Sequence, residues 1–247
     1  MNYLYTPKDE MGEIVWHLEN KLGKLETTLG LIWPNLANGF VDINDPVLRK
    51  GLSLFVAVMH LRNPECRQSI ERLHQQLVKF FKTVSVQPDG SPAVTSLEVA
   101  GVTYELEAHG WREYQAWGRN DHDRFFAHVV ESEAIDLATL LMKKRWSIVF
   151  SESDIFITSD MPVVLQHQSR KTFGFGTQNS IVTFPLSPRR MLVMDDLHAE
   201  PAGQYYPLKP SNSGAFNYNI WSKSSRFMVT GRAVHDVLSE IMASAIK

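Results

Sequence analysis

The chain of 247 residues is 44% hydrophobic and 21% charged, so it has the length and apolar content to bury a substantial core. Its formal net charge of −2 excludes the global basic surface that drives non-specific binding to nucleic acids. The one cysteine, Cys66, excludes an internal disulfide and a cysteine-rich zinc site.

The first half of the chain has helical patterns. Thr6, Pro7 and the acids that follow predict a helix start, and apolar residues at three- and four-residue spacing continue this helix to Pro34, where we expect it to end. Asn44-Asp45-Pro46 predicts the start of a second helix, which Pro64 interrupts because proline removes a helical hydrogen bond. Further helices are predicted over residues 65–81, 121–144, 213–223 and 234–246.

Short β-branched or aromatic segments replace this pattern from Trp146 onward. They are separated by turn residues and cover residues 146–150, 155–158, 163–166, 181–184, 191–194 and 226–230. Helices followed by strands predict an α+β fold, in which an N-terminal helical half (1–145) packs on a C-terminal, mostly antiparallel sheet (146–247) with a closing helix. No linker between the halves is long or polar enough to separate them, so we expect residues 1–247 to form a single domain.

Three oxygen-bearing side chains, Thr158, Ser159 and Asp160, end one of the predicted strands. Open sheets often carry their sites at this end of a strand, where a carboxylate such as Asp160 can orient a water molecule or act as a base. The alternative is structural, because an Asp that precedes Met161-Pro162 commonly caps a turn through backbone N–H groups. Ser159 is a candidate nucleophile, although no Gly-x-Ser-x-Gly elbow surrounds it.

His60 and Arg62 form a second candidate pair, at the end of an apolar helix just before Pro64. A guanidinium in this position could hold a carboxylate or phosphate group through two parallel hydrogen bonds. It could equally pair with the last carbonyls of the helix or with a buried acid. His60 is a candidate binding residue, against the more common role of a histidine packed at the edge of a core.

Three motifs carry a family resemblance: the helix end Arg62-Asn63-Pro64, the segment 156–163 (Phe-Ile-Thr-Ser-Asp-Met-Pro-Val) and the segment 184–188 (Phe-Pro-Leu-Ser-Pro). Together they resemble a bacterial family known as domain of unknown function 4238, over roughly residues 10–231. The resemblance implies that Asn217, in a late helix, and Arg226 contribute to the same site. Members of the family open with a segment of the type His-His-x-Val-Pro-x-x-Tyr-Leu, which this sequence lacks, so we expect either a late start or a shortened relative.

Two hypotheses from different classes follow. The first is a hydrolase that acts on a phosphate-bearing or nucleic-acid substrate. It would use Asp160, Ser159 and Arg62 as catalytic residues and Thr158, His60, Asn217 and Arg226 as substrate-binding residues. The second is a non-catalytic protein-interaction or ligand-binding module, with a protein partner or a second copy held by aromatic anchors. These anchors would be Trp16, Trp33, Phe40 and Trp111.

Charge and composition set the remaining expectations. The densest basic runs, Lys143-Lys144-Arg145 and Arg189-Arg190, could meet a nucleic acid or could be a solvated helix end and turn. No apolar run has the length of a membrane-spanning helix, and no signal-peptide pattern is visible, so a cytoplasmic location without membrane contact is expected. The sequence assigns no cofactor. It also predicts no metal site, because His122 and His128 lie six residues apart and off a common helix face.

Overall fold

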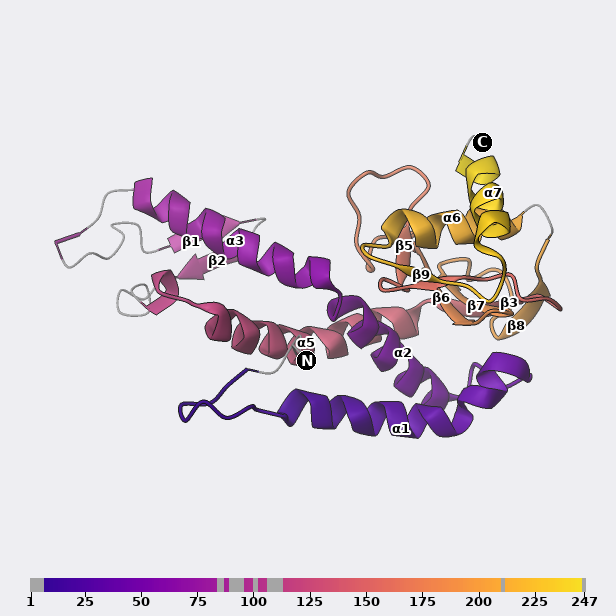
Figure 1. The fold of residues 1–247 in the computed structure, drawn as a ribbon, viewed down its shortest axis with the longest axis horizontal. Helices are drawn as coiled ribbons and strands as arrows, with labels where there is room; N and C mark the ends of the chain where they lie inside the picture. The colour runs from indigo at the N-terminus through magenta and orange to yellow at the C-terminus, as the bar shows by residue number, and fades with distance from the viewer. Residues whose placement is uncertain are drawn as a thin grey trace. The chain divides into compact units, whose positions relative to one another are not determined.

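The structure is a computed structural model that describes residues 7–83, 87–88, 96–99, 102–105, 113–209 and 212–245. The elements follow in the order α1 (His17–Asn38), α2 (Pro46–Leu61), α3 (Pro64–Thr83), β1 (Ser96–Val99), β2 (Val102–Glu105), α5 (Arg119–Lys143), β3 (Arg145–Phe150), β4 (Thr158–Ser159), β5 (Val164–Gln166), β6 (Ile181–Ser187), β7 (Arg190–Asp195), β8 (Gln204–Pro207), α6 (Ser213–Lys223), β9 (Met228–Val229) and α7 (Val234–Ala245) (Figure 1). Helices dominate up to α5, strands dominate after it, and α7 closes the chain. This order confirms the predicted α+β class.

The chain divides into two compact units. The small unit comprises Met1–Leu18 and Pro64–Val129, and the sheet unit comprises Glu19–Asn63 and Val130–Lys247. The division falls inside α1 and inside α5, so each of these helices contributes residues to both units. The expectation of a single domain stays a prediction.

The sheet unit contains a five-stranded sheet with the strand order β5-β6-β7-β3-β8. Its first four strands are antiparallel neighbours, as predicted, whereas β8 pairs in parallel with β3, with Ser147 opposite Gln204. The chain enters β8 through Gly203, whose φ of +77° favours glycine and whose N–H donates to the Trp146 carbonyl at 2.8 Å. A Cβ atom at this position would collide with Asn44. No pattern in the sequence predicts β8.

The core of the sheet unit joins the strands to the two C-terminal helices. Figure 1 shows α6 and α7 side by side. They approach so closely that a Cβ atom on Gly214 of α6 would collide with the backbone and side chain of α7. The buried residues of this core are Phe156, Ile157, Val164, Met191, Ile220, Val237 and Ile241. Both helices lie where the sequence predicted them. Each has a face of buried residues that packs in this core, and this face is the source of the helical pattern in the sequence.

The helix α1 differs from the prediction at both ends. It begins at His17 rather than near Pro7, because the Asp9 carboxylate accepts hydrogen bonds from the backbone N–H groups of Met11 and Glu13 and holds this segment as a turn. Thr6, the predicted cap, lies outside the described residues. The helix also continues through Pro34 to Asn38.

Packing explains why Pro34 does not end α1. The Trp33 ring makes edge contacts with Phe55 of α2 at 5.5 Å and with Phe184 of β6 at 6.5 Å, and Leu36 is fully buried. An internal proline costs a helix about 3 kcal/mol, and the burial of two large side chains beside it is of comparable size. The second helix begins at Pro46, as predicted, and of the two polar residues before it Asp45 is the cap. None of the described helices is long and apolar enough to cross a membrane.

Candidate functional site

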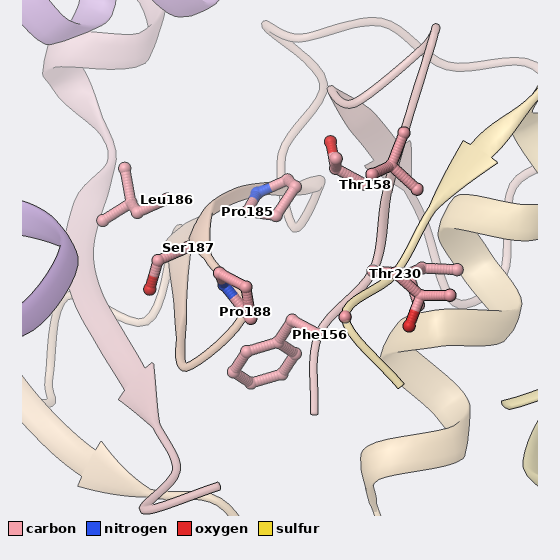
Figure 2. A pocket seen from close by; sticks show the side chains of 10 residues that line it. Phe156, Thr158, Pro185, Leu186, Ser187, Pro188 and Thr230 are labelled. Atoms are coloured by element: carbon pink, nitrogen blue, oxygen red, sulfur yellow. The ribbon is translucent and has the colours of Figure 1, made fainter. Parts of the chain in front are cut away.

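Three segments that are distant in the sequence meet around one small pocket in the sheet unit. They are residues 156–158, which lead into β4, residues 185–188 at the turn from β6 to β7, and residues 229–231 after β9. The pocket has a volume of about 150 Å³. Figure 2 shows Pro185, Ser187 and Pro188 on one side of the pocket, Thr158 and Thr230 on the other, and Phe156 between them. We call it the motif pocket, because two of its three segments belong to the motifs that carry the family resemblance.

Backbone irregularities shape the wall formed by residues 185–188. The pairing of β6 with β7 shifts register between Pro185 and Ser187, as expected for a proline, which cannot donate to a sheet and is found at bulges. The carbonyl of Pro188 then accepts hydrogen bonds from the N–H groups of Ile155 and Phe156, both at 2.8 Å. These bonds attach the first segment to the second, so the pocket is built by the motif residues themselves.

The side chains that line the motif pocket are apolar or carry a hydroxyl group, and none of the ten ionises. The Ser187 hydroxyl donates to the Ala37 carbonyl at 3.0 Å, and the Thr230 hydroxyl accepts from the Arg232 N–H at 3.0 Å. Among the described residues, the Thr158 hydroxyl has no hydrogen-bond partner. The pocket can therefore hold a small uncharged group and offer it a hydroxyl, but its lining supplies no acid or base.

Asp160 and Ser159 make local bonds to the backbone. The Asp160 carboxylate accepts hydrogen bonds from the N–H groups of Ser225, at 3.1 Å, and Arg226, at 2.9 Å. The Ser159 hydroxyl accepts from the Met161 N–H at 3.1 Å. Asp160 thus binds backbone N–H groups, as a structural role requires, but they belong to a distant segment and not to the turn at Met161-Pro162 that the alternative named. These bonds bring Asp160 next to Arg226 but leave neither residue in the lining of the motif pocket.

Asn217 is fully buried in α6 and also binds backbone. Its Oδ1 accepts from the Ile157 N–H at 3.1 Å, and its Nδ2 donates to the Ile155 carbonyl at 3.0 Å. Both peptide groups belong to the segment that leads to the motif pocket. Asn217 therefore positions one wall of the pocket without lining it.

Arg62 and His60 also lie outside the lining of the motif pocket. The Arg62 guanidinium faces two acids of α1, at 3.7 Å from Glu19 and 3.5 Å from Glu26. Both carboxylates are partly exposed, so they are not the buried acid that the structural alternative named. The His60 ring makes an edge contact with Phe175 at 4.6 Å, and burial lowers the pKa of His60 from 6.5 to about 4. His60 is consequently neutral at physiological pH.

Most residues of the basic runs have internal partners, whereas Lys143 is exposed. Lys144 donates to Ser180 and pairs with Asp196 at 3.0 Å, and Arg145 forms a bidentate pair with Asp195 at 2.8 and 2.6 Å. Lys144 and Arg145 are both buried, so they present no charge to a nucleic acid. The second run is similar. Arg189 pairs with Asp154 at 2.6 Å, and buried Arg190 donates to the carbonyls that end α1.

Two of the aromatic anchors expected for a protein partner are exposed, namely Trp16 and Phe40. Trp33 is packed against Phe55 and Phe184, and Trp111 lies outside the described residues. Among the residues that the structure describes, no three His, Cys, Asp or Glu side chains are placed to hold a metal ion.

Of the seven predicted site residues, Thr158 alone lines the motif pocket. Ser187 and Pro188 were recognised as part of a motif but not as site residues. Thr230 was not recognised, because the pattern around it carries no signal beyond a short strand. The pairing of β4 with β9, in which Thr158 lies opposite Val229, brings this third segment to the pocket.

Comparison with known proteins gives one match. The model of the family described as "Protein of unknown function (DUF4238)" matches residues 1–233. No curated protein matches the chain, and no solved structure does.

Proposed function

Because the chain belongs to the DUF4238 family of proteins of unknown function, we propose a function from its own geometry, namely a ligand-binding module that holds a small uncharged group in the motif pocket. One observation carries this proposal. Three segments, two of them motif segments, enclose a pocket whose lining combines apolar rings with hydroxyl groups and contains no ionisable side chain. Small-molecule sites commonly have this composition, with few polar groups that fix orientation.

The size and lining of the motif pocket define the ligand group. A volume of about 150 Å³ accommodates a group of the size of one aliphatic side chain or a five-membered ring. Phe156, Pro185 and Pro188 provide apolar contact, and the Thr158 hydroxyl can donate to an acceptor on the ligand. A charged group would lose its hydration here without gaining an ionic partner, which disfavours it.

The test is a screen of small uncharged amides and cyclic ethers by ligand-observed NMR. Val229 lines the pocket and is 55% exposed, so Val229→Trp should cover the pocket without disturbing the core. We expect a set of mutually competing ligands whose affinity falls at least about tenfold in Val229→Trp. The matched control is Val47→Trp, because Val47 is 80% exposed and does not line the pocket. The proposal fails if no ligand in the screen loses binding in Val229→Trp alone.

A hydrolase that acts on a phosphate-bearing substrate is the second candidate. The observation in its favour is the end of β4, where the hydroxyl of Ser159 is followed by the carboxylate of Asp160, which binds the backbone of Arg226. The bonds of Asp160 to two backbone N–H groups favour a structural role instead. Asp160→Ala, compared with the surface control Asp154→Ala, tests this candidate on phosphatase and nuclease substrates. Loss of a measured activity in Asp160→Ala, with the fold retained, would support the hydrolase over the binding module.

A further inference from the structure

A polar cleft in the small unit contains charged and aromatic groups that the motif pocket lacks. It has a volume of about 430 Å³, within the range of small-molecule sites. Its lining includes Arg67, Glu71 and Gln75 from α3, together with Trp117, Arg119 and His122 at the start of α5. We call it the small-unit cleft.

The back of the small-unit cleft is a cluster of rings. The His74 ring stacks on Trp117 with centroids 5.4 Å apart and meets the edge of His122 at 4.7 Å. His74 Nε2 lies 2.7 Å from the Tyr114 carbonyl oxygen. Because a carbonyl can only accept, Nε2 carries the proton in this bond.

Two buried imidazole nitrogens lack partners next to the cleft. Within the described part of the chain, neither His74 Nδ1 nor His122 Nδ1 has a hydrogen-bond partner, and His74 is more than nine-tenths buried. Buried polar atoms are nearly always paired, with protein, water or a ligand. Since His122 Nδ1 is enclosed, the ring can offer only its Nε2 edge to a molecule in the cleft.

The charges of the cleft are arranged asymmetrically. Arg67 is fixed by Asp123 at 2.6 Å and by Glu71 at 3.2 Å. Arg119 is 69% exposed at its side chain, and its Nε lies 3.9 Å from Asp123, so this pair is loose. Arg67 is thus neutralised by two acids, and the loosely held Arg119 is the guanidinium in the lining that can meet an anion. The carboxylate of Glu71 can still accept from a hydroxyl group.

We propose that the small-unit cleft binds the phosphate group of a hydroxylated small molecule, such as a sugar phosphate or a nucleoside monophosphate. Arg119 and the Nε2 edge of His122 donate to phosphate oxygens. Glu71 and Gln75 bind hydroxyl groups of the small molecule that carries the phosphate. The Trp117 side chain provides an apolar surface for the ring of that molecule. This site goes beyond the proposed function, because it shares no residue with the motif pocket and binds a charged ligand, whereas the motif pocket holds an uncharged group.

Protonation gives a specific signature for this ligand. Burial lowers the pKa of His122, and nearby charges act on the same pKa. The groups concerned are His74 and Arg67, which lower it, and Glu71 and Asp121, which raise it. A bound phosphate adds negative charge and raises the pKa of His122, so binding near neutral pH should take up protons.

Titration calorimetry of the full chain tests the proposal with inorganic phosphate, glucose 6-phosphate, adenosine monophosphate and glucose as probes. We expect at least one phosphate ester to bind more tightly than inorganic phosphate, and glucose not to bind. Arg119→Gln should weaken ester binding about tenfold. The control Arg72→Gln removes the same charge from an exposed position of α3 that is not in the lining, and should leave binding unchanged.

Repeating the titration in buffers of different ionisation enthalpy measures proton uptake, which should disappear in His122→Gln. Absence of binding by both esters would overturn the proposal. Equal weakening by Arg119→Gln and Arg72→Gln would also overturn it, because it would show non-specific attraction. Binding of inorganic phosphate as tight as that of the esters would refute the roles given to Glu71, Gln75 and Trp117. Val229→Trp should not change ester binding, which separates this test from that of the motif pocket.

Discussion

Asn217 serves backbone groups of a distant segment rather than a ligand. Replacing Asn217 with Ala leaves the buried Ile157 N–H without an acceptor, whereas the Ile155 carbonyl keeps its bond from Arg232. Leaving one buried donor unsatisfied, together with the lost side-chain packing, should lower the free energy of unfolding by about 2 kcal/mol. Urea denaturation of Asn217→Ala measures this effect.

The control for that prediction is Asn219→Ala, two residues along α6 at a partly exposed position. It should change the free energy of unfolding by less than about 0.5 kcal/mol. If the two variants lose equal stability, the hydrogen bonds from Asn217 to Ile155 and Ile157 do not stabilise the fold.

His60 should make stability depend on pH. Its pKa is about 4 in the folded chain, because burial disfavours the charged ring, and near 6.5 when the chain unfolds. Between these pH values the unfolded chain binds more protons than the folded chain. The neutral His60 therefore costs no stability above pH 6.5, and the free energy of unfolding decreases as pH falls from 6.5 toward 4. At pH 5 the loss should be roughly 2 kcal/mol.

Denaturation at pH 7 and pH 5 measures the effect, and His60→Gln should reduce the difference between the two pH values. Replacement of the exposed His198 is the matched control and should leave the difference as it is. A His60→Gln variant with the same pH dependence as the parent chain would show that other groups cause it.

At the scale of single elements, the start of α2 depends on one carboxylate. Asp45 Oδ1 accepts from the N–H groups of Val47, at 3.0 Å, and Leu48, at 2.8 Å. Asp45→Ala should lower the free energy of unfolding by about 1 kcal/mol, and Asp45→Asn, which keeps an acceptor, should restore most of it. Thermal unfolding of both variants is the measurement. Equal losses would mean that the charge, and not the cap, stabilises this helix end.

Elements with local causes could be predicted from the sequence, and those with distant causes could not. The cap at Asp45 uses bonds within three residues, so the start of α2 was predictable. The strand β8 is a strand only through its pairing with β3, and its residues are mostly exposed and carry no apolar alternation. The continuation of α1 past Pro34 depends on rings from α2 and β6, which the local pattern does not contain.

The candidate site shows the same limit. Thr158 and the segment 185–188 were recognisable because proline and hydroxyl residues in a motif are a local signal. That they face each other depends on bonds from the Pro188 carbonyl, and Thr230 joins them through a pairing of only two residues per strand. Polar residues near a strand end could likewise be identified, but not their partners. Asp160 and Asn217 both bind backbone groups that lie at least sixty residues away along the chain.

At the scale of the whole molecule, we propose that the two units unfold together. The division between them runs through the middle of α5, whereas it leaves only His17 and Leu18 of α1 in the small unit. Melting of one unit alone would therefore cut α5 in its middle, where the exposed turns lose their hydrogen bonds. Differential scanning calorimetry of the full chain should therefore show one transition, with agreement between calorimetric and van't Hoff enthalpies. Two separable transitions would contradict the prediction of a single domain.

The bonds of Asn217 also bear on the order in which the chain is synthesised. The segment 155–157 leaves the ribosome before α6, which carries the only side chain found to bind both its Ile157 N–H and its Ile155 carbonyl within the described structure. Until α6 has emerged, these two peptide groups and the apolar Phe156 and Ile157 side chains stay open to solvent, chaperones or neighbouring chains. The wall of the motif pocket is thus completed late, and a nascent chain that pauses before residue 217 leaves the apolar segment 155–157 uncovered.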